Sequence, residues 1–593
     1  MAEWKNLVSM FYSQADRMGE KPFIWSKVDG SYKSLSWKEA AYQITTLSSS
    51  LKNLGIQSGD RVFLCAESRP EWIISNIAIM ALGGITVPAY TTNTVEDHHH
   101  ILSDSGSKIA IVSKSTLANR VITAANKTDT VETVIVMEPL EGEESGKIQM
   151  VNWADAMKPQ SELSGNIDEL ISGISRDDTA VIIYTSGTGG APKGVMLAHK
   201  SIIHNCVAAR NLLTGFGLED EVFLSFLPLS HSYEYTGGQF FPISIGAQVY
   251  FAEGVEQLRT NLTEAKPTLM TAVPRLYESM HARIVRGVDQ AGGLKAKLFK
   301  LALTLGEKKL DENNKLTFIE KLLDSVVEKL VRKKVRNTFG GRLKALVSGG
   351  APLNLDIGIF FSALGLRLLQ GYGQTESAPI ISANPPEKIK LHSVGPPVSN
   401  TEVKIADDGE ILVRGDLVMQ GYWRNETATK EAIKDGWLHT GDVGKIDSDG
   451  YIEITDRKKD IIVNSGGDNI SPQRVEGFLT LQPEIEQAIV YGDKRPHLVA
   501  LLVPGVEHAT DWANKNGLSD NLSDLIENKE FIKTLDSAVA RVNSELGVIE
   551  QVRRFALTSE SFSVENEQMT PTLKVRRHII GQIYKEKFES MYK

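Results

Sequence analysis

The sequence predicts an α/β protein: a large N-terminal domain of βαβ sheets with a β subdomain, followed by a small, mobile α/β C-terminal cap. Three observations support this prediction. Residues from about 36 to 250 alternate amphipathic helical patterns with short Val/Ile-rich runs, which favours parallel sheets covered by helices. A Gly/Pro-rich region near 394–424 is typical of β structure. After Arg457 the strand and helix patterns start again.

The individual elements follow in chain order. Short apolar, β-prone runs predict N-terminal strands at Arg61–Cys65, Lys108–Val112, Thr133–Met137, Val181–Tyr184 and Gln248–Phe251. An Asp-Asp-Gly turn between two further runs predicts paired strands at Glu402–Ile405 and Glu410–Val413. Beyond Arg457 we expect a strand, a helix and two more strands at Ile461–Asn464, 472–482, Ile489–Tyr491 and Leu498–Val503. We therefore expect two domains, 1–457 and 458–593.

Composition narrows the class of protein. At 593 residues the chain is too long for one hydrophobic core, and 41% hydrophobic with 23% charged residues is ordinary for a soluble protein. A net charge of −9 and the lack of basic clusters interleaved with aromatics argue against nucleic-acid binding. Cys65 and Cys206 are the only cysteines, so a disulfide framework is excluded. No signal peptide or apolar run of ~20 residues is visible, so we expect a cytoplasmic protein.

The most informative segment is a loop rich in small residues. Residues 184–194 read Y-T-S-G-T-G-G-A-P-K-G and follow a predicted buried strand. Small residues allow backbone N–H groups to approach an anion, and Lys193 adds a mobile positive charge. The loop is not a Walker A motif, because Pro192 and Gly194 occupy positions where that motif needs Gly and Ser/Thr. A polyphosphate cradle is the functional prediction, and a solvated turn is the alternative.

Further motifs resemble one enzyme superfamily along nearly the whole chain. Their order and spacing are similar to those of the adenylate-forming superfamily of acyl-CoA synthetases, luciferases and peptide-synthetase adenylation domains: Q-G-Y-G-Q-T-E at 370–376, W-L-H-T-G-D at 437–442, T-D-R-K-K-D at 455–460 and T-P-T-L-K at 570–574. Within it the chain most resembles bacterial long-chain fatty-acid–CoA ligases, through R-P-E-W at 69–72, V-P-A-Y-T-T-N-T at 87–94 and L-P-L-S-H-S-Y-E at 227–234. The family usually has Thr-Thr-Gly where Thr188-Gly189-Gly190 stands here. The missing hydroxyl removes one phosphate hydrogen bond, worth about 1–3 kcal/mol, so we expect weaker ATP binding with activity retained.

The resemblance implies phosphate and metal contacts. Phosphate-loop contacts to ATP would come from Thr185, Ser186, Gly187, Thr188, Gly190 and Lys193. Glu376 would bind Mg²⁺, with Thr185 as a second contact, and Thr375 would touch the α-phosphate. One carboxylate suffices, because Mg²⁺ prefers hard oxygen ligands and retains several waters.

The resemblance also implies an adenosine site. Tyr372, between Gly371 and Gly373, would stack on adenine, and the S-G-G-A-P-L loop would form the neighbouring wall with Gly349, Gly350 and Ala351. Asp442 would accept hydrogen bonds from the ribose hydroxyls, and Arg457 would reach the ribose or the phosphates. The structural alternatives are a core tyrosine at 372 and an ordinary salt bridge between the two charged residues.

Catalytic and hinge residues follow from the same resemblance. His231 would contact the substrate carboxylate, and Lys574 would stabilise charge on the α-phosphate and the leaving pyrophosphate. Lys459 matches the hinge, about which the cap would rotate to bring Gly466 and Gly467 near the thiol arm of coenzyme A. The run His98-His99-His100 does not predict a zinc site, because three consecutive side chains cannot converge on one helix face.

The predicted function is a two-step ligation. A long-chain fatty acid and ATP would give an acyl-adenylate and pyrophosphate, and coenzyme A would then give acyl-CoA and AMP, with Mg²⁺ as cofactor. One alternative is adenylation of an aryl, medium-chain or amino acid by the same fold; Glu234 leaves the amino acid open because it could pair with a substrate ammonium. A non-catalytic lipid-binding protein is the other alternative. Adenylation chemistry is mainly a matter of positioning and charge neutralisation, since an anion attacks an anion.

A basic segment stands apart from the acidic chain. Residues 285–342 carry 14 Lys/Arg against 7 Asp/Glu. An apolar stripe at helical spacing with interleaved basic residues runs through it: Leu322, Leu323, Val326, Val327, Leu330 and Val331, with Lys321, Lys329, Lys333 and Arg336. One interpretation is a solvated helix packed on the core. The other is peripheral contact with an anionic membrane, at its inner face, where fatty acid could be collected. A homodimer is also left open.

Overall fold

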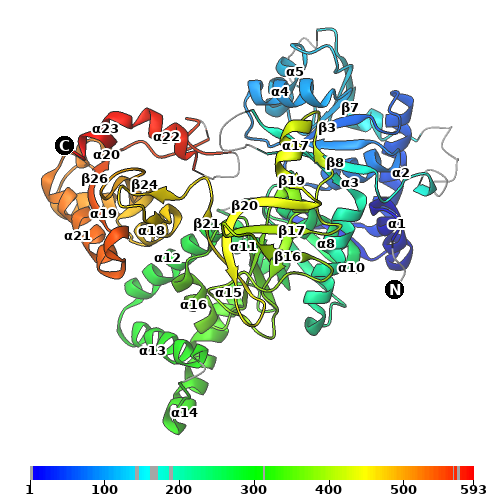
Figure 1. Ribbon diagram of the computed structural model, residues 1–593. Coiled ribbons are helices and arrows are strands. Elements are labelled where there is room, and N and C mark those ends of the chain that lie inside the picture. The colour runs from blue at the N-terminus through cyan, green and yellow to red at the C-terminus, as the bar shows by residue number, and fades with distance from the viewer. Residues whose placement is uncertain are drawn as a thin grey trace.

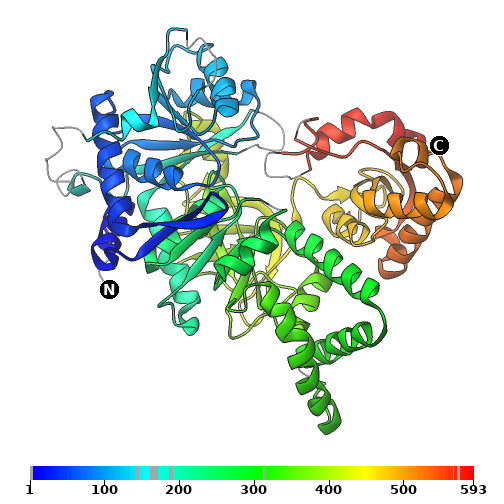
Figure 2. The same cartoon turned by 180° about the vertical axis from the view of Figure 1, so that it is seen from behind.

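The computed structural model describes residues 4–140, 146–159, 171–185, 191–254, 256–311, 314–564, 566–570 and 575–593. It has a large N-terminal domain of sheets and helices and a smaller C-terminal domain, which lies beside it as a separate body (Figure 1, Figure 2). This is the predicted fold class. In the part of the chain described, no helix is both long enough and apolar enough to cross a bilayer.

The first N-terminal sheet has eight strands; the six from β8 to the edge strand β7 pair in parallel, and β9 and β18 are added antiparallel at the other edge. Their order across the sheet is β18 (Gly421–Tyr422), β9 (Lys193–Ala198), β8 (Thr179–Thr185), β4 (Ile85–Pro88), β3 (Arg61–Cys65), β5 (Ile109–Val112), β6 (Thr133–Val136) and β7 (Gln149–Asn152). Helices α2 (Trp37–Asn53), α3 (Pro70–Ala81), α4 (Val95–Ser105) and α5 (Ser115–Ala125) precede or connect these strands. The strands predicted at 61–65, 108–112, 133–137 and 181–184 are confirmed here, within three residues at their ends. Val/Ile-rich runs buried on both faces explain why these strands were readable.

The second sheet also has eight strands and a parallel centre. Its order is β15 (Ile380–Ala383), β14 (Leu368–Gly373), β13 (Ala345–Ser348), β12 (Leu269–Ala272), β10 (Val222–Ser225), β11 (Gln248–Phe251), β1 (Pro22–Val28) and β2 (Ser31–Ser36). Parallel strands β13 and β14 place Ser348 opposite Gln370, so the segments that follow them leave the same edge of the sheet. Ligand sites of α/β proteins form at such carboxyl ends.

A smaller antiparallel sheet forms the β subdomain. It contains β16 (Glu402–Ile405), β17 (Glu410–Arg414), β20 (Trp437–Ile446), β19 (Ile433–Lys434) and β21 (Ile452–Arg457), the last paired with β20. The hairpin predicted around the Asp-Asp-Gly turn is confirmed as β16 and β17. Strand β21 ends at Arg457 and is the last strand of this sheet along the chain.

The C-terminal domain is built on a three-stranded sheet of β24 (Ile485–Tyr491), β25 (Leu498–Pro504) and β26 (Val552–Leu557). A short hairpin, β22 (Ile462–Val463) and β23 (Asn469–Ile470), precedes α18 (Pro472–Thr480), so the predicted strand–helix–strand–strand order is confirmed. The domain also contains α19 (Val506–Asn516), α20 (Leu522–Leu525), α21 (Lys529–Glu545), α22 (Arg577–Ile583) and α23 (Lys585–Ser590). It has its own hydrophobic core, and Glu507 forms an ion pair with Arg286 of the N-terminal domain.

The basic segment forms helices α12 (Pro274–Ala291), α13 (Gly293–Leu310), α14 (Phe318–Val327) and α15 (Lys333–Thr338), with a π-helical stretch at Glu328–Arg332 between the last two. Of the six stripe residues only Val327 and Val331 are buried, and the other four are exposed. The interpretation as a helix whose stripe packs on the core is therefore wrong for most of the stripe. Sequence spacing identifies a helix face but not the direction in which it points.

Candidate active site

The loop predicted to cradle phosphates connects two antiparallel strands. Register pairs Thr185, the last residue of β8, with Lys193, the first of β9, so both predicted contacts stand side by side at the mouth of a hairpin. Ser186, Gly187, Thr188 and Gly190 lie outside the described residues. Gly194 is packed so closely that an added Cβ would lie 2.7 Å from Ile182 Cγ2, which excludes a larger residue after the lysine.

Tyr422 links the loop lysine to the predicted magnesium ligand. Its hydroxyl donates to Glu376 Oε1 at 2.8 Å, and Lys193 Nζ lies 5.1 Å from the centre of its ring. Burial, with the nearby Glu376 charge, raises the Tyr422 pKa, so the phenol stays protonated and remains a donor. Strand β18 holds this tyrosine opposite Val195 of β9. Tyr422 was not predicted from the sequence, because its only local signal is a Gly-Tyr-Trp run at 421–423, far from the loop in sequence.

Glu376 can hold a cation in addition to this hydrogen bond. A carboxylate has about four lone-pair sites, and Tyr422 uses one of them. Glu376 lies just after the end of β14. The neighbouring Thr375 contacts Ser232 through their hydroxyls, with Oγ1 and Oγ 3.1 Å apart. The Q-T-E motif therefore meets the L-P-L-S-H-S motif, although 143 residues separate the two contacting hydroxyls.

His231 caps the short helix α9 (Ser232–Glu234) beside this contact. Its Nδ1 accepts the backbone N–H of Tyr233 at 3.2 Å. In the neutral ring the proton is then on Nε2, which makes that nitrogen a donor. Such a donor suits an incoming carboxylate, and the role of His231 at the substrate carboxylate stays a prediction.

Tyr372, Asp442 and Arg457 form one connected group. The Tyr372 hydroxyl donates to Asp442 Oδ2 at 2.7 Å, and Arg457 Nε donates to Asp442 Oδ1 at 3.2 Å. Asp442 of β20 and Arg457 of β21 are direct register partners, and Tyr372 reaches them from β14. Burial, reinforced by the Asp442 charge, raises the Tyr372 pKa, so its phenol is a permanent donor. Each Asp442 oxygen keeps one lone pair for another donor.

The predicted adenine wall lies at the same sheet edge. Gly349, Gly350 and Ala351 follow β13 directly, next to the Gly371–Gly373 segment of β14. Gly349 packs on Tyr233, since an added Cβ would lie 3.2 Å from its Cζ, and Gly350 has a φ of +84°, a conformation that favours glycine. The buried Ser348 Oγ has no hydrogen-bond partner among the described residues. A buried polar group without a partner is a natural contact for a ligand.

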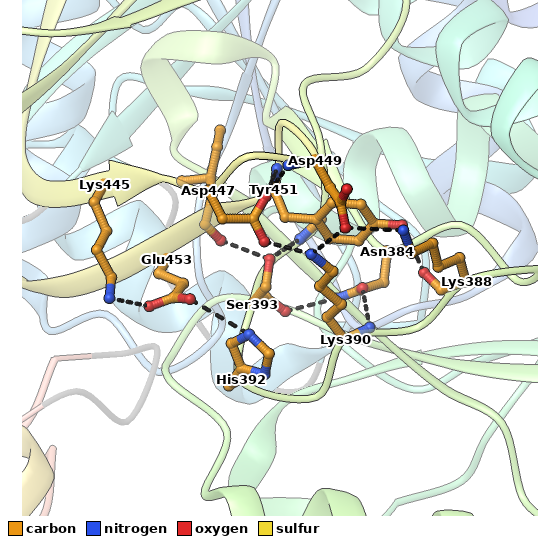
Figure 3. A network of polar contacts seen from close by, with 12 residues as sticks. Asn384, Lys388, Lys390, His392, Ser393, Lys445, Asp447, Asp449, Tyr451 and Glu453 are labelled. Carbon is orange, nitrogen blue, oxygen red and sulfur yellow. Dashed lines mark hydrogen bonds and ion pairs between the residues drawn. The ribbon is translucent and has the colours of Figure 1, made fainter. Parts of the chain in front are cut away.

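A polar network holds the hairpin that carries Asp442 (Figure 3). Lys390 Nζ lies 2.5 Å from Asp447 Oδ2 and 2.7 Å from Asp449 Oδ2, and Lys388 Nζ lies 2.9 Å from Asp449 Oδ2. Hydrogen bonds from Lys388 and Lys390 lower the Asp449 pKa to about 2. Each of these partly exposed pairs contributes little alone, but together they join the β20–β21 turn to the segment after β15.

Glu234 is buried in the core, where its carboxylate is hydrogen-bonded. Its carboxylate accepts hydrogen bonds from Ser225 Oγ and Thr271 Oγ1, both at 2.6 Å, and the side chain is fully buried. An amino-acid ammonium would need this carboxylate to be available, so the contacts remove the reason for that alternative. Burial raises the Glu234 pKa to about 7 despite the two hydroxyl donors.

Glu234 therefore makes stability depend on pH. The folded state binds this proton more tightly than the unfolded state, so the contribution is largest below pH 4.5 and is lost as pH rises to about 7. The Glu234→Gln variant, which cannot ionise, should gain roughly 3 kcal/mol of unfolding free energy relative to wild type across that window. Urea unfolding at both ends of the window measures the difference, and a difference independent of pH would show that the carboxyl does not titrate there.

The remaining predicted residues lie on the C-terminal side. Lys458 pairs with Asp408 at 2.6 Å and Glu410 at 3.2 Å, and is thereby tied to the β subdomain. Lys459 follows it and has no ion pair or side-chain hydrogen bond within the described ranges. Gly466 and Gly467 form the turn between β22 and β23, where Asn464 Oδ1 accepts the Gly466 N–H, and their hydrogen bonds stay within the C-terminal domain. Lys574 lies outside the described residues.

Comparison with known proteins shows the family of the chain. The chain matches the family model "AMP-binding enzyme" over residues 11–423 and "AMP-binding enzyme C-terminal domain" over residues 459–593. It is 33% identical over 601 aligned residues to the long-chain-fatty-acid–CoA ligase FadD15 of Mycobacterium bovis, covering 100% of this chain and 98% of that protein. To human long-chain-fatty-acid–CoA ligase 1 it is 30% identical, covering 95% and 83%.

Solved structures share the fold. The A domain of a carboxylic acid reductase from Segniliparus rugosus, in complex with AMP and a co-purified carboxylic acid, superposes with a TM-score of 0.76 at 19% identity, covering 100% of this chain and 95% of that one. The anthranilate CoA ligase AuaEII, in complex with anthranoyl-AMP, gives 0.71 at 20% identity, covering 100% and 98%.

Proposed function

Because this chain belongs to the AMP-binding enzyme family, we propose that it is a long-chain fatty-acid–CoA ligase. In the first step a carboxylate oxygen attacks the α-phosphate of ATP, and pyrophosphate leaves as the acyl-adenylate forms. In the second step the thiolate of coenzyme A attacks the acyl carbon, and AMP leaves as acyl-CoA forms. The observation that carries the proposal is the meeting of Tyr372, Asp442 and Arg457 at one sheet edge, in a chain aligned end to end with such ligases.

Asp442 would hold the ribose of ATP. Its two remaining lone pairs, one on each oxygen, match the two vicinal ribose hydroxyls, while Tyr372 and Arg457 fix the carboxylate plane. The ring of Tyr372 and the segment 349–351 would enclose the adenine. This arrangement positions the nucleotide without taking part in bond changes.

Phosphate charge would be neutralised from two sides. Lys193 and the hairpin mouth would face the β- and γ-phosphates, and Thr375 would approach the α-phosphate. Glu376, with Thr185, would hold Mg²⁺, a hard cation that suits oxygen donors and whose bound charge offsets that of the phosphates. Tyr422 would orient Glu376 while leaving its other lone pairs for the cation. His231 would donate from Nε2 to the substrate carboxylate.

The cap would separate the two half-reactions. We place the cap at 458–593 and its hinge at Lys459. The hinge position is supported by Lys458, which is tied to the β subdomain by ion pairs, while Lys459 is the first residue without such a tie. Lys574 would serve adenylation in one orientation. In the other, the turn at Gly466–Gly467 would line the path of the coenzyme A thiol arm.

The proposed substrate suggests where the enzyme would act. Long-chain fatty acids partition into bilayers, and peripheral contact with an anionic membrane through residues 285–342 would bring the enzyme to them. No nucleic-acid partner is part of the proposal.

Exchange of radiolabelled pyrophosphate into ATP tests the first half-reaction alone. We expect exchange that depends on Mg²⁺ and on palmitate, and that falls steeply when octanoate, benzoate or an amino acid replaces palmitate. Exchange driven best by an aryl or amino acid would contradict the fatty-acid assignment. A complete lack of exchange with every acid would instead indicate a non-catalytic lipid-binding protein.

A further inference from the structure

One amphipathic helix of this protein presents its apolar face to solvent. Helices α13 and α14 project together as an arm from the N-terminal domain (Figure 1, Figure 2). One face of α14 and the following π-helix, which we call the α14 face, is exposed at Phe318 (77%), Ile319 (70%), Leu322 (57%), Leu323 (40%), Val326 (47%) and Leu330 (46%). The first five follow the i, i+1, i+4, i+5, i+8 spacing of a single helix face.

The charged face of α14 packs inward instead. Glu320 pairs with Lys308 of α13 at 2.8 Å, and Asp324 pairs with Lys309 at 3.0 Å and with Arg332 at 2.6 Å. A surface helix normally has the opposite arrangement, with apolar residues inside and charges in water. The inverted arrangement leaves a contiguous apolar surface that a water-facing helix does not need.

The arm is held rigidly in this orientation. Arg332 is buried, and it donates from Nε to the carbonyl of Ala363 at 2.7 Å and from Nη2 to that of Ala302 at 2.8 Å, joining three helices. Gly306 lets α13 lie directly on α16 (Leu355–Ala363), since an added Cβ would be 2.4 Å from the Ala363 carbonyl. The packing of the arm therefore fixes the outward orientation of the α14 face, and its exposure is not the result of a frayed helix end.

Positive charge borders the apolar residues. Lys321 is three residues from Phe318 and Lys329 three residues from Val326, so each lies beside the α14 face. Both are exposed, as is Lys315, and the ammonium group of none of the three has an ion pair or hydrogen bond with any residue that the structure describes. The acidic side chains of α14 are already neutralised by inward pairs. An anionic bilayer complements this surface, whereas a second copy would bring like charges together.

We propose that the α14 face inserts into the headgroup region of an anionic bilayer and docks the enzyme on the membrane. The helix lies in the plane of the interface, with its apolar side chains about 5–10 Å deep and with Lys315, Lys321 and Lys329 extended to lipid phosphates. The inference rests on the proposed fatty-acid substrate for its purpose, since docking brings the enzyme to a bilayer that contains the acid. The docking itself requires no catalysis.

A fluorophore on the α14 face tests insertion directly. Cys65 and Cys206 are buried, and burial raises the pKa of both thiols, so a cysteine introduced as Leu322→Cys can be labelled selectively with an NBD group. With vesicles of phosphatidylcholine and phosphatidylglycerol, and without ATP or fatty acid, we expect an emission blue-shift and quenching by brominated lipids. Val548→Cys, exposed in the C-terminal domain, is the matched control and should not respond. Lack of a response at position 322 would overturn the proposal.

Charge and apolar contributions can be separated by substitution. Lys321→Gln with Lys329→Gln should weaken partition into these vesicles about 25-fold, the product of about fivefold per lost lysine. Leu322→Ser with Val326→Ser should weaken it by at least about tenfold. Equal binding to pure phosphatidylcholine would contradict the role of the lysines. A dimer in analytical ultracentrifugation that Leu322→Ser abolishes would assign the α14 face to a second copy and overturn the proposal.

Turnover distinguishes this inference from the proposed function. With palmitate in detergent micelles, the Leu322→Ser/Val326→Ser variant should match wild type, while with palmitate supplied in anionic vesicles its rate should fall severalfold. Vesicle binding without any ligase activity would refute the proposed function and leave the docking surface standing. Ligase activity without vesicle binding would refute the docking surface and leave the proposed function standing.

Discussion

The Asp442→Ala variant will lower kcat/KM for ATP about a thousandfold, because two charge-assisted hydrogen bonds to the ribose, each worth about 1.5–3 kcal/mol, are lost. The substitution also leaves the buried Tyr372 hydroxyl without its acceptor. Ribose hydroxyls do not change charge during the reaction, so most of the loss should be in KM and less in kcat. Initial rates of pyrophosphate release at varied ATP concentrations measure both.

Two variants serve as controls for Asp442. Asp449→Ala removes an exposed carboxylate from the same hairpin, and its KM for ATP should remain within about twofold of wild type because exposed pairs contribute little. Tyr372→Phe removes one donor to Asp442 but keeps the ring, and about a tenfold loss is expected from one hydrogen bond to a charged group. An unchanged KM for ATP in Asp442→Ala, in a protein with wild-type circular dichroism, would contradict the ribose assignment.

The Lys459→Pro variant will separate the two half-reactions. Proline fixes φ near −65°, while a hinge residue must absorb a large change in backbone dihedrals, so the cap would be held in one orientation. We expect thioester formation from supplied acyl-adenylate and coenzyme A to fall by about two orders of magnitude, because the cap could no longer rotate into the orientation for this step. Adenylation, measured by pyrophosphate exchange, should stay within about fivefold of wild type.

Lys459→Ala is the matched control for the hinge. It removes the same side chain but leaves φ free, so both half-reactions should remain close to wild type. A proline variant with normal thioester formation would refute the hinge at this position. An alanine variant as impaired as the proline variant would show that the ammonium group matters and the backbone does not.

Lys574→Ala is the converse of the hinge variant. Loss of its positive charge should slow adenylation roughly a hundredfold, the usual scale for a group that stabilises developing charge, and should spare thioester formation from supplied adenylate. Equal losses in both half-reactions would contradict its assignment to adenylation.

Much of the fold was readable because its signals are local. Arg61–Cys65 is an apolar run that is mostly buried, and Gln248–Phe251 alternates half-buried and buried residues; the structure places both strands at the predicted residues. The hairpin at Glu402–Ile405 was readable from its turn. Order and spacing of short motifs then identified the superfamily, which the family models confirm.

Features that depend on contacts between residues far apart in the sequence could not be predicted from the sequence. Tyr422 reaches Glu376 only because strand β18 pairs with β9, more than 220 residues away in the sequence. No local sequence pattern predicts that pairing. Glu234 had an ambiguous role in the sequence, which the hydroxyls of Ser225 and Thr271 resolve. The helical stripe at 322–331 was visible, but only the structure shows that most of it faces outward.

Product identification tests the central claim most directly: that the grouped side chains position ATP for attack at its α-phosphate. Purified protein with palmitate, coenzyme A, Mg²⁺ and ATP should release AMP and pyrophosphate in equal amounts, with one acyl-CoA for each. Release of ADP and inorganic phosphate, or nucleotide cleavage indifferent to the fatty acid, would contradict it.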